Sequence, residues 1–411
     1  GSRRTAGKLE FRSQPPLSLY IHIPWCVRKC PYCDFNSHEA KGAIPEGDYI
    51  AALIADLEAA LPFIWGRRVT TIFIGGGTPS LLSGEAVDAL LTAVRTRVTL
   101  IPEAEITLEA NPGTVEAARF AAYREAGVNR LSLGIQSFNP AHLRALGRIH
   151  DADEAREAIA LAGRHFERFN LDLMYGLPQQ TLAEALSDVE IALSYRPRHL
   201  SCYQLTLEPN TPFAAAPPAL PENDLCADMQ EAIEARLANA GFEHYETSAF
   251  AQPGFRCQHN LNYWSFGDYL GIGAGAHGKL TMHDRALRQM RFRQPAQYLR
   301  QVAAGQPVHE QTDVAAAELP FEFMMNALRL VDGFDPGLFE ARTTVPLFGI
   351  ERELRQAEAD GLIERTPQRI APTLRGQRFL NKLLRRFLPN EKNGRHPSGR
   401  AGRRGSIRFA Q

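Results

Sequence analysis

The sequence has few cysteines for its length, no long apolar run and no net charge. Six cysteines among 411 residues are too few for a disulfide-stabilised scaffold, so we expect a reducing compartment. No uninterrupted apolar stretch is long enough to span a bilayer, and no charged-then-apolar leader opens the chain. The formal net charge of zero provides no overall field that would attract nucleic acid. We therefore expect a cytoplasmic protein that neither crosses a membrane nor binds nucleic acid.

Length and composition predict a large globular domain with smaller ones attached. A chain of 411 residues exceeds what one ordinary hydrophobic core organises. Its apolar share of 44% and charged share of 22% are typical of globular proteins. We expect residues 1–16 to form a flexible lead-in and residues 385–411, rich in arginine and glycine, to form a disordered basic tail. A second interpretation of this tail is weak attraction to an anionic membrane surface.

Strand-like and helix-like segments alternate regularly between residues 17 and 242. Strands are expected at residues 17–23, 69–74, 105–108, 130–133, 169–174 and 199–205. Helical periodicity follows them at residues 48–63, 84–94, 115–126, 141–165 and 182–193. Such alternation favours a parallel sheet with helical crossovers. The predicted fold class is α/β, with a partial (β/α)6 barrel.

Half of the cysteines stand close together just after the first expected strand. Cys26, Cys30 and Cys33 have a C-x3-C-x2-C spacing. Thiolates this close can converge on one metal centre, and soft sulfur ligands select zinc or iron–sulfur clusters. Three cysteines on a [4Fe–4S] cube leave one iron open to a small molecule, whereas four would close it. The alternatives are a structural zinc site completed by His22 or His38 and buried thiols that lie together by chance.

Polar or glycine-rich residues occur where each of the next strands ends. They are Gly75 to Gly77, Glu109, Gln136 and Asp172. Active sites of barrels of this type are built from the loops that follow the strands, so we expect these residues to share one rim. Three of these four features also have a structural alternative. The glycines could form a tight turn, Glu109 could cap a helix, and Asp172 could form a buried salt bridge with Arg148 or Arg130.

Together these residues resemble one branch of the radical S-adenosylmethionine (SAM) superfamily. This branch contains the oxygen-independent coproporphyrinogen III oxidases and the related heme chaperones. The resemblance covers roughly residues 17–384. Its motifs are Tyr20-Ile-His-Ile-Pro, Gly75-Gly-Gly-Thr-Pro, Glu109-Ala-Asn-Pro, Gly134-Ile-Gln-Ser-Phe and Asp172-Leu-Met-Tyr-Gly-Leu-Pro.

The resemblance implies a set of ligands for a [4Fe–4S] cluster and for SAM. By it, Cys26, Cys30 and Cys33 bind the cluster, whose open iron takes SAM. The residues implied to line SAM are Tyr20, Tyr32, Gly76, Gly77, Thr78 and Glu109. Gln136, Arg148 and Asp172 match positions that complete the SAM surface in the oxidases, including a second SAM. An electron donor is implied if SAM is reductively cleaved.

Three features separate the two branches of the family. Phe35 stands where the oxidases carry a fourth cysteine, and the segment before the first strand is shorter than theirs. His259-Asn260-Leu-Asn-Tyr263-Trp264 resembles the H-N-x-x-Y-W motif of the chaperones. An imidazole beside two aromatic rings suits a porphyrin, although an aromatic core cluster with a hydrogen-bonded histidine is the alternative. His277, within a glycine-rich stretch, is a further candidate to lie beside SAM.

Beyond the barrel, residues 243–312 are expected to form a sheet extension and residues 313–384 a small winged-helix-like α+β domain. Mixed charge in that domain argues against nucleic-acid binding. The resemblance implies a heme chaperone that binds a [4Fe–4S] cluster, SAM and heme and delivers heme to respiratory acceptor proteins, expected at the inner membrane surface. The alternatives are oxidative decarboxylation of coproporphyrinogen III and a zinc-stabilised barrel with a docking domain.

Overall fold

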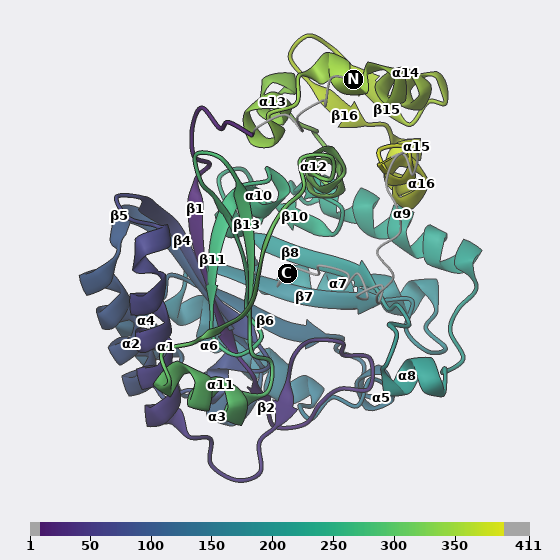
Figure 1. Cartoon of the computed structure of the whole chain (residues 1–411). Helices are drawn as coiled ribbons and strands as arrows, with labels where there is room; N and C mark the ends of the chain where they lie inside the picture. Colours follow the sequence, from purple (N-terminus) through teal and green to yellow (C-terminus); the bar gives the residue numbers. More distant parts are fainter. Residues whose placement is uncertain (1–8, 390–411) are drawn as a thin grey trace.

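The computed structural model describes residues 9–389, and a twelve-stranded sheet forms its centre (Figure 1). The strand order is β14-β13-β12-β11-β1-β4-β5-β6-β7-β8-β10-β9. Neighbouring strands from β11 through β1 to β8 pair in parallel. The strands beyond β11 and beyond β8 pair antiparallel. Both edges of a parallel sheet are thus extended by antiparallel strands.

The six expected strand–helix units are present, which confirms the partial barrel. Its strands are β1 (Leu17–Ile23), β4 (Arg68–Gly76), β5 (Thr99–Ala110), β6 (Arg130–Gln136), β7 (Arg168–Tyr175) and β8 (His199–Gln204). The main helices are α1 (Glu46–Ala60), α2 (Gly84–Arg97), α4 (Phe120–Ala126), α6 (Ala152–His165), α7 (Leu182–Ser194) and α9 (Asn223–Asn239). Apolar residues of these helices and strands form one core cluster.

Shorter elements complete the barrel. They are β2 (Trp25–Cys26), β3 (His38–Glu39), α3 (Thr114–Ala117), α5 (Pro140–Ala145) and α8 (Pro212–Ala215). Helix starts follow local sequence signals, as at α7, where Thr181 and Glu184 form a reciprocal capping box. The sequence therefore marks the start of α7, whereas α1, α4 and α9 begin without a side-chain cap.

The segment after the barrel extends the sheet at two edges rather than leading away from it. Strands β9 (Glu243–Glu246) and β10 (Ala249–Ala251) add to β8. Strands β11 (Asp268–Ile272), β12 (His277–Thr281), β13 (Ala286–Arg291) and β14 (Val308–Asp313) add to β1, with α11 (Pro295–Ala303) between the last two. Helix α10 (Gln258–Trp264) packs between these edges, because Leu261 contacts the apolar clusters on both sides.

The C-terminal elements form a second core, in a small lobe above the sheet in Figure 1. They are α12 (Leu319–Ala327), α13 (Pro336–Thr343), α14 (Glu351–Ala359), β15 (Ile363–Arg365), β16 (Ile370–Pro372), α15 (Leu374–Arg378) and α16 (Leu380–Arg385). The ring of Phe323 meets those of Phe334 and Phe339 edge to face, with centroids 5.0 and 5.3 Å apart. Helices and a hairpin agree with the expected α+β character.

Residues 9–16 differ from the expected flexible lead-in. Phe11 is only 6% exposed and belongs to the C-terminal core, and its N–H donates to the carbonyl of His283 at 2.9 Å. The carbonyl of Pro16 accepts the N–H of Asp268 at 3.0 Å. This segment therefore joins the C-terminal domain to the barrel. Residues 1–8 of the expected lead-in lie outside the described residues.

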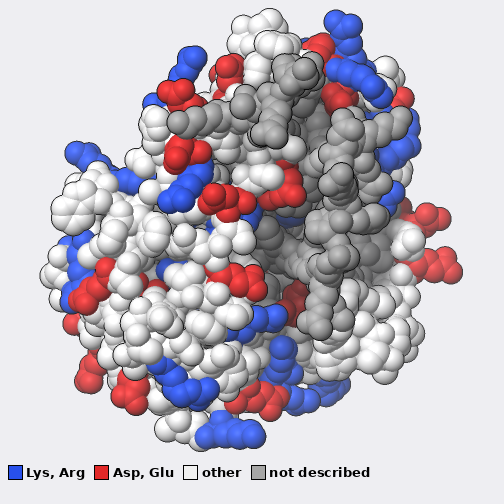
Figure 2. Space-filling view, viewed as in Figure 1, with Lys and Arg blue, Asp and Glu red and all other residues white. Residues whose placement is uncertain are grey.

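The described residues bear on two expectations, one about membrane crossing and one about surface charge. Between residues 9 and 389, no helix is both long and apolar enough for a bilayer crossing. Acidic and basic side chains are interspersed over the face in Figure 2. Beyond residue 389, the expected basic tail lies outside the described residues.

Candidate functional site

The three clustered cysteines lie on a loop that leaves the C-terminal end of β1 and folds back on itself. Strands β2 and β3 close the loop by parallel pairing. Within it, the N–H of Cys33 donates to the carbonyl of Cys30 at 3.0 Å. Cys26 is buried, whereas Cys30 and Cys33 are partly exposed. Burial raises the pKa of the Cys26 thiol to about 11 and also raises that of Cys33, so a metal has to displace protons on binding.

Distant parts of the chain hold this loop through Asn36. The side-chain amide of Asn36 donates to the carbonyl of Ala274 at 3.1 Å and to that of Arg293 at 2.9 Å. Ala274 follows β11 and Arg293 follows β13, so both contacts come from the sheet extension. The sheet extension therefore fixes the position of the cysteine loop.

The two histidines considered as zinc ligands also anchor the loop. His22 is bonded through Nε2 to the carbonyl of Asn36 at 2.7 Å and through Nδ1 to the hydroxyl of Tyr20 at 2.9 Å. Burial lowers the pKa of His22 to about 4, so the ring is neutral at pH 7. His38 Nε2 contacts Oδ1 of Asn36 at 3.1 Å. These contacts favour loop anchoring over zinc binding for both residues.

The glycine motif brings the end of β4 against the cysteine loop. A Cβ on Gly76 would lie 2.5 Å from the carbonyl oxygen of Ile23, and one on Gly77 2.5 Å from that of Trp25. Gly76 also has a φ of +121°, which disfavours other residues. The N–H groups of Gly77 and Thr78 donate to these same two carbonyls, each at 2.7 Å. The close approach that requires glycine here is therefore between two backbone segments.

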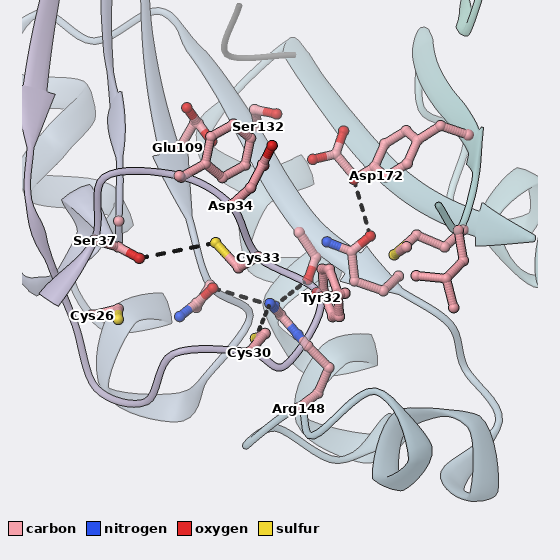
Figure 3. A pocket seen from close by; sticks show the side chains of 18 of the residues that line it. Cys26, Cys30, Tyr32, Cys33, Asp34, Ser37, Glu109, Ser132, Arg148 and Asp172 are labelled. Carbon is pink, nitrogen blue, oxygen red and sulfur yellow. Dashed lines mark hydrogen bonds between the residues drawn. The ribbon is translucent and has the colours of Figure 1, made fainter. Parts of the chain in front are cut away.

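Most of the predicted site residues surround one cavity of about 470 Å³ at the C-terminal ends of the strands (Figure 3). They are Cys26, Cys30, Tyr32, Cys33, Gly76, Gly77, Thr78, Glu109, Gln136, Arg148, Asp172 and Trp264. Within residues 9–389, no three His, Cys, Asp or Glu side chains converge on one metal ion. The case for a cluster therefore rests on three thiols sharing a cavity with room for a larger group, a donor set that suits iron and sulfide.

Arg148 connects the cysteine loop to the strand ends. Its Nη1 lies 3.7 Å from Sγ of Cys30, and its Nη2 donates to the carbonyl of Gly134 at 2.6 Å and to Oδ1 of Asn111 at 3.2 Å (Figure 3). A guanidinium beside a thiol stabilises the thiolate, which is the form that binds metal. Arg148 is thus placed to support a cluster bound at Cys30.

Two carboxyl groups, the half-buried Glu109 and the buried Asp172, face the same cavity. One carboxyl oxygen of Glu109, Oε1, is buried without a hydrogen-bond partner among the described residues. Burial and the nearby Asp172 raise the pKa of Glu109 well above its usual value. Burial raises the pKa of Asp172 to about 7. A buried polar atom without a partner is a place where a ligand donor fits, such as the ammonium or a ribose hydroxyl of SAM.

The alternative considered for Asp172, a buried salt bridge, is not formed among the described residues, and a hydrogen bond is present instead. Its Oδ1 accepts from the side-chain amide of Asn170 at 2.7 Å. Arg130 and Arg148 lower its pKa only through longer-range attraction. Gln136, at the end of β6 with a φ of +69°, accepts from the hydroxyl of Tyr203 at 3.1 Å.

Two residues expected beside SAM lie outside the cavity lining. Tyr20 stacks on Phe73, with ring centroids 6.4 Å apart, and contacts His22 rather than the cavity. His277 begins β12 and is exposed. In this structure, Tyr20 supports the cysteine loop through His22, and His277 does not reach the cavity.

The H-N-x-x-Y-W motif forms helix α10, and its histidine lies in the core. His259 is fully buried, with Nδ1 2.7 Å from the hydroxyl of Thr71 and Nε2 2.8 Å from that of Tyr263. Its ring stacks on Phe73 at a centroid distance of 5.0 Å, and burial lowers its pKa to about 3. Both ring nitrogens are engaged, which corrects the expectation that His259 faces heme iron.

The rest of the motif divides between core and cavity. Tyr263 is 3% exposed and Asn260 8% exposed, and neither lines the cavity. Trp264 lines it together with Arg329, which sequence reasoning missed. Arg329 follows α12 in the C-terminal domain. Its local sequence carries no signal for a site, because only the packing of this domain on the barrel brings it there.

Comparisons with known proteins agree with this geometry. Residues 20–191 match the radical SAM superfamily, and residues 314–379 match the HemN C-terminal domain. The heme chaperone HemW of Escherichia coli is 52% identical, over 91% of this chain and 98% of the relative. The heme chaperone HemW of Haemophilus influenzae is 49% identical, over 92% and 99%. Both family matches cover the regions that were assigned above to the barrel and to the C-terminal lobe.

A solved structure of E. coli coproporphyrinogen III oxidase (HemN), a radical SAM enzyme, shares the fold. Its TM-score is 0.77 at 24% identity, covering 91% of this chain and 90% of that one. The high identity to the chaperones extends over nearly the whole chain. The protein therefore belongs to the radical SAM superfamily and, within it, to the HemW heme chaperone family.

Proposed function

We propose that this protein binds heme and delivers it to acceptor proteins, and that it holds a [4Fe–4S] cluster through Cys26, Cys30 and Cys33. Membership of the radical SAM superfamily implies the cluster and SAM. Heme as cargo is the function named for the relatives. The three thiols that share one cavity support the cluster assignment.

The residues around the thiols have different roles, some toward the cluster and others toward SAM. Arg148 places its guanidinium beside the sulfur of Cys30, and the glycine motif allows the loop to pack against β4. Glu109, Thr78 and Gln136 offer oxygens and an amide to the polar groups of SAM. A cluster bound there supplies an open iron for SAM and an electron when reduced, for which a donor protein is needed. The chain's own contribution is to position and orient these groups.

The observation that carries the choice of chaperone over oxidase is Phe35. Its side chain is 40% exposed and lines the cavity next to Cys33, where the oxidases are expected to carry a fourth cysteine. A phenyl ring supplies no metal ligand but offers a flat apolar face to a macrocycle. Tyr32, Tyr203 and Trp264 add aromatic surface to the same cavity.

The chemistry of the thiols supports the proposed compartment, and the name of the relatives supports heme acceptors as partners. All six cysteines are free, and a cluster held only by thiolates is favoured by a reducing compartment. We therefore place the protein in the cytoplasm, with heme acceptors at the inner membrane surface as its partners.

The test is anaerobic reconstitution with iron and sulfide, followed by separate incubations with heme and with coproporphyrinogen III, each with SAM and a reductant. We expect a Soret band at a fixed heme stoichiometry and no decarboxylated product. Cys30→Ser should lower iron uptake, whereas Cys226→Ser, a buried thiol outside the cavity, should not. Conversion of coproporphyrinogen would make the protein an oxidase. Uptake of zinc in place of iron would contradict both functions.

A further inference from the structure

We propose that Arg329 and Trp264 form a carboxylate-binding subsite that takes a propionate group of the bound porphyrin. The inference deepens the proposed function and rests on it. The subsite lies where the turn between β9 and β10 and the C-terminal domain border the cavity. It would give the C-terminal domain a direct contact with the cargo.

The guanidinium of Arg329 lies over an aromatic ring. Its Cζ lies 4.4 Å from the ring centroid of Trp264, whose side chain is almost fully buried. The carbonyl of Arg329 also accepts the N–H of Thr247 at 3.1 Å, which fixes its backbone to the β9–β10 turn. Stacking on an indole favours a cation and restricts its rotation. The donors of Arg329 are therefore positioned before a ligand arrives.

The hydrogen-bond donors of Arg329 are only partly used within the described residues. Its Nη2 lies 3.2 Å from Oε2 of Glu246, the side chain with which it forms an ion pair. The other oxygen of Glu246 accepts from the N–H of Ser248 at 2.7 Å and from its hydroxyl at 3.1 Å. A guanidinium carries five N–H donors, and Nε of Arg329 is buried without a partner among the described residues. Donors thus remain for a second carboxylate.

The residues around Arg329 favour a ligand that joins an anionic group to a planar ring. Besides its ion-pair partner Glu246, Arg329 contacts Thr247 and Trp264, which are uncharged and line the cavity with it. The same lining also contains the uncharged side chains of Tyr203, Gln204, Gln230 and Ser248. Hydroxyl and amide groups can share a carboxylate with the guanidinium, and the rings can contact a macrocycle. Heme fits this description because it joins two carboxylates to a planar ring. SAM also has a carboxylate, so the test has to separate the two sources.

The test compares two ligands on three proteins, all with the cluster reconstituted. Heme and heme dimethyl ester, in which both propionates are esterified, are titrated into the wild type, Arg329→Gln and Arg256→Gln. Arg256 is the matched control, since it also stacks on an aromatic ring, at 5.2 Å from Tyr245, and pairs with Asp332 across the same domain junction, but does not line the cavity. Arg329→Gln should weaken heme binding about tenfold, the scale of one charge-assisted hydrogen bond, and leave ester binding unchanged.

Three other outcomes would overturn the inference. Equal loss of heme and ester binding would indicate a structural role for Arg329, and unchanged binding of both would exclude a contact. A loss of SAM affinity in Arg329→Gln with heme binding intact would assign the subsite to SAM. If this variant unfolds, Arg329→Lys is used instead, because lysine keeps the positive charge but lacks the paired N–H donors of the guanidinium. Arg329→Lys should show a smaller preference for heme over the ester than the wild type does. Failure of the wild type to bind heme at all would instead refute the proposed function.

Discussion

Asp172 is a carboxyl group buried at the edge of the cavity, and its protonation is coupled to stability. Burial raises its pKa from 3.8 to about 7. Between these values, the folded chain binds more protons than the unfolded chain, so this group makes stability fall as pH rises, and its full cost is present above pH 7. Asp172→Asn removes the titrating group. The variant should be more stable than the wild type at pH 8, by at most about 4 kcal/mol, and similar to it at pH 4.

This effect is measured by thermal unfolding of both proteins across pH 4 to 8. The informative quantity is the difference between them, because buried histidines such as His259 contribute an opposite pH dependence to each protein equally. A difference in melting temperature that does not change with pH would mean that Asp172 does not titrate in this range.

Gly77 tests whether backbone contact between β4 and the cysteine loop is needed for cluster binding. A Cβ at this position would lie 2.5 Å from the carbonyl oxygen of Trp25, so Gly77→Ala must displace the loop at a cost of roughly 1–3 kcal/mol. We expect a clear loss of iron bound per chain after reconstitution. Gly47→Ala, where a Cβ would meet nothing within 4 Å, should bind iron normally. Normal iron content in Gly77→Ala would show that the loop tolerates the displacement.

For individual residues, the sequence predicted that the three thiols share one site, but it did not predict which way the side chain of His259 points. The spacing of Cys26, Cys30 and Cys33 was sufficient to place them together. The direction of His259 depends on helix α10, which the sequence reasoning did not assign. In a helix, residues four apart share a face, so His259 and Tyr263 both point into the core. Trp264, about 100° further round, reaches the cavity instead.

At the scale of elements, the cysteine loop depends on the sheet extension for its position. Asn36 bonds to carbonyl groups that follow β11 and β13, 238 and 257 residues further along the chain. Asn36→Ala removes both hydrogen bonds and leaves two carbonyls without their donor. We expect the reconstituted cluster of this variant to decay faster in air than that of the wild type. The decay is measured as the loss of the cluster's visible absorbance.

The control for this prediction is Asn139→Ala. Asn139 caps α5, with its side chain accepting from Ala141, so its loss costs about 1 kcal/mol of stability without touching the cysteine loop. Equal decay rates in the two variants would indicate a general effect of stability and would remove the anchoring role of Asn36.

The barrel elements were predictable because apolar residues recur along each strand, at alternate positions in β1, and at three- and four-residue spacing in the helices that follow. The sheet extension was not placed correctly. Residues 268–272 form β11, which pairs in parallel with β1, although nearly the whole barrel lies between them in sequence. Apolar patterning shows that a strand is buried, but it does not show which strand is its partner.

At the scale of the whole molecule, the segment before β1 joins the two cores. Phe11 packs in the C-terminal core although it precedes the barrel. Phe11→Ala should destabilise this core by about 3 kcal/mol and lower the melting temperature. Trp65→Ala, at a side chain that is 83% exposed, should leave it unchanged. An unaltered melting temperature in Phe11→Ala would mean that the segment contributes nothing to the junction.

The proposed function requires that the protein bind heme and retain it as cargo. The most direct measurement is an anaerobic titration of the cluster-loaded wild type with heme, followed by gel filtration to separate bound from free heme. We expect a Soret band that saturates at a fixed ratio of heme to chain and elutes with the protein. A Soret change that rises without saturation, or heme that separates from the chain on the column, would contradict it.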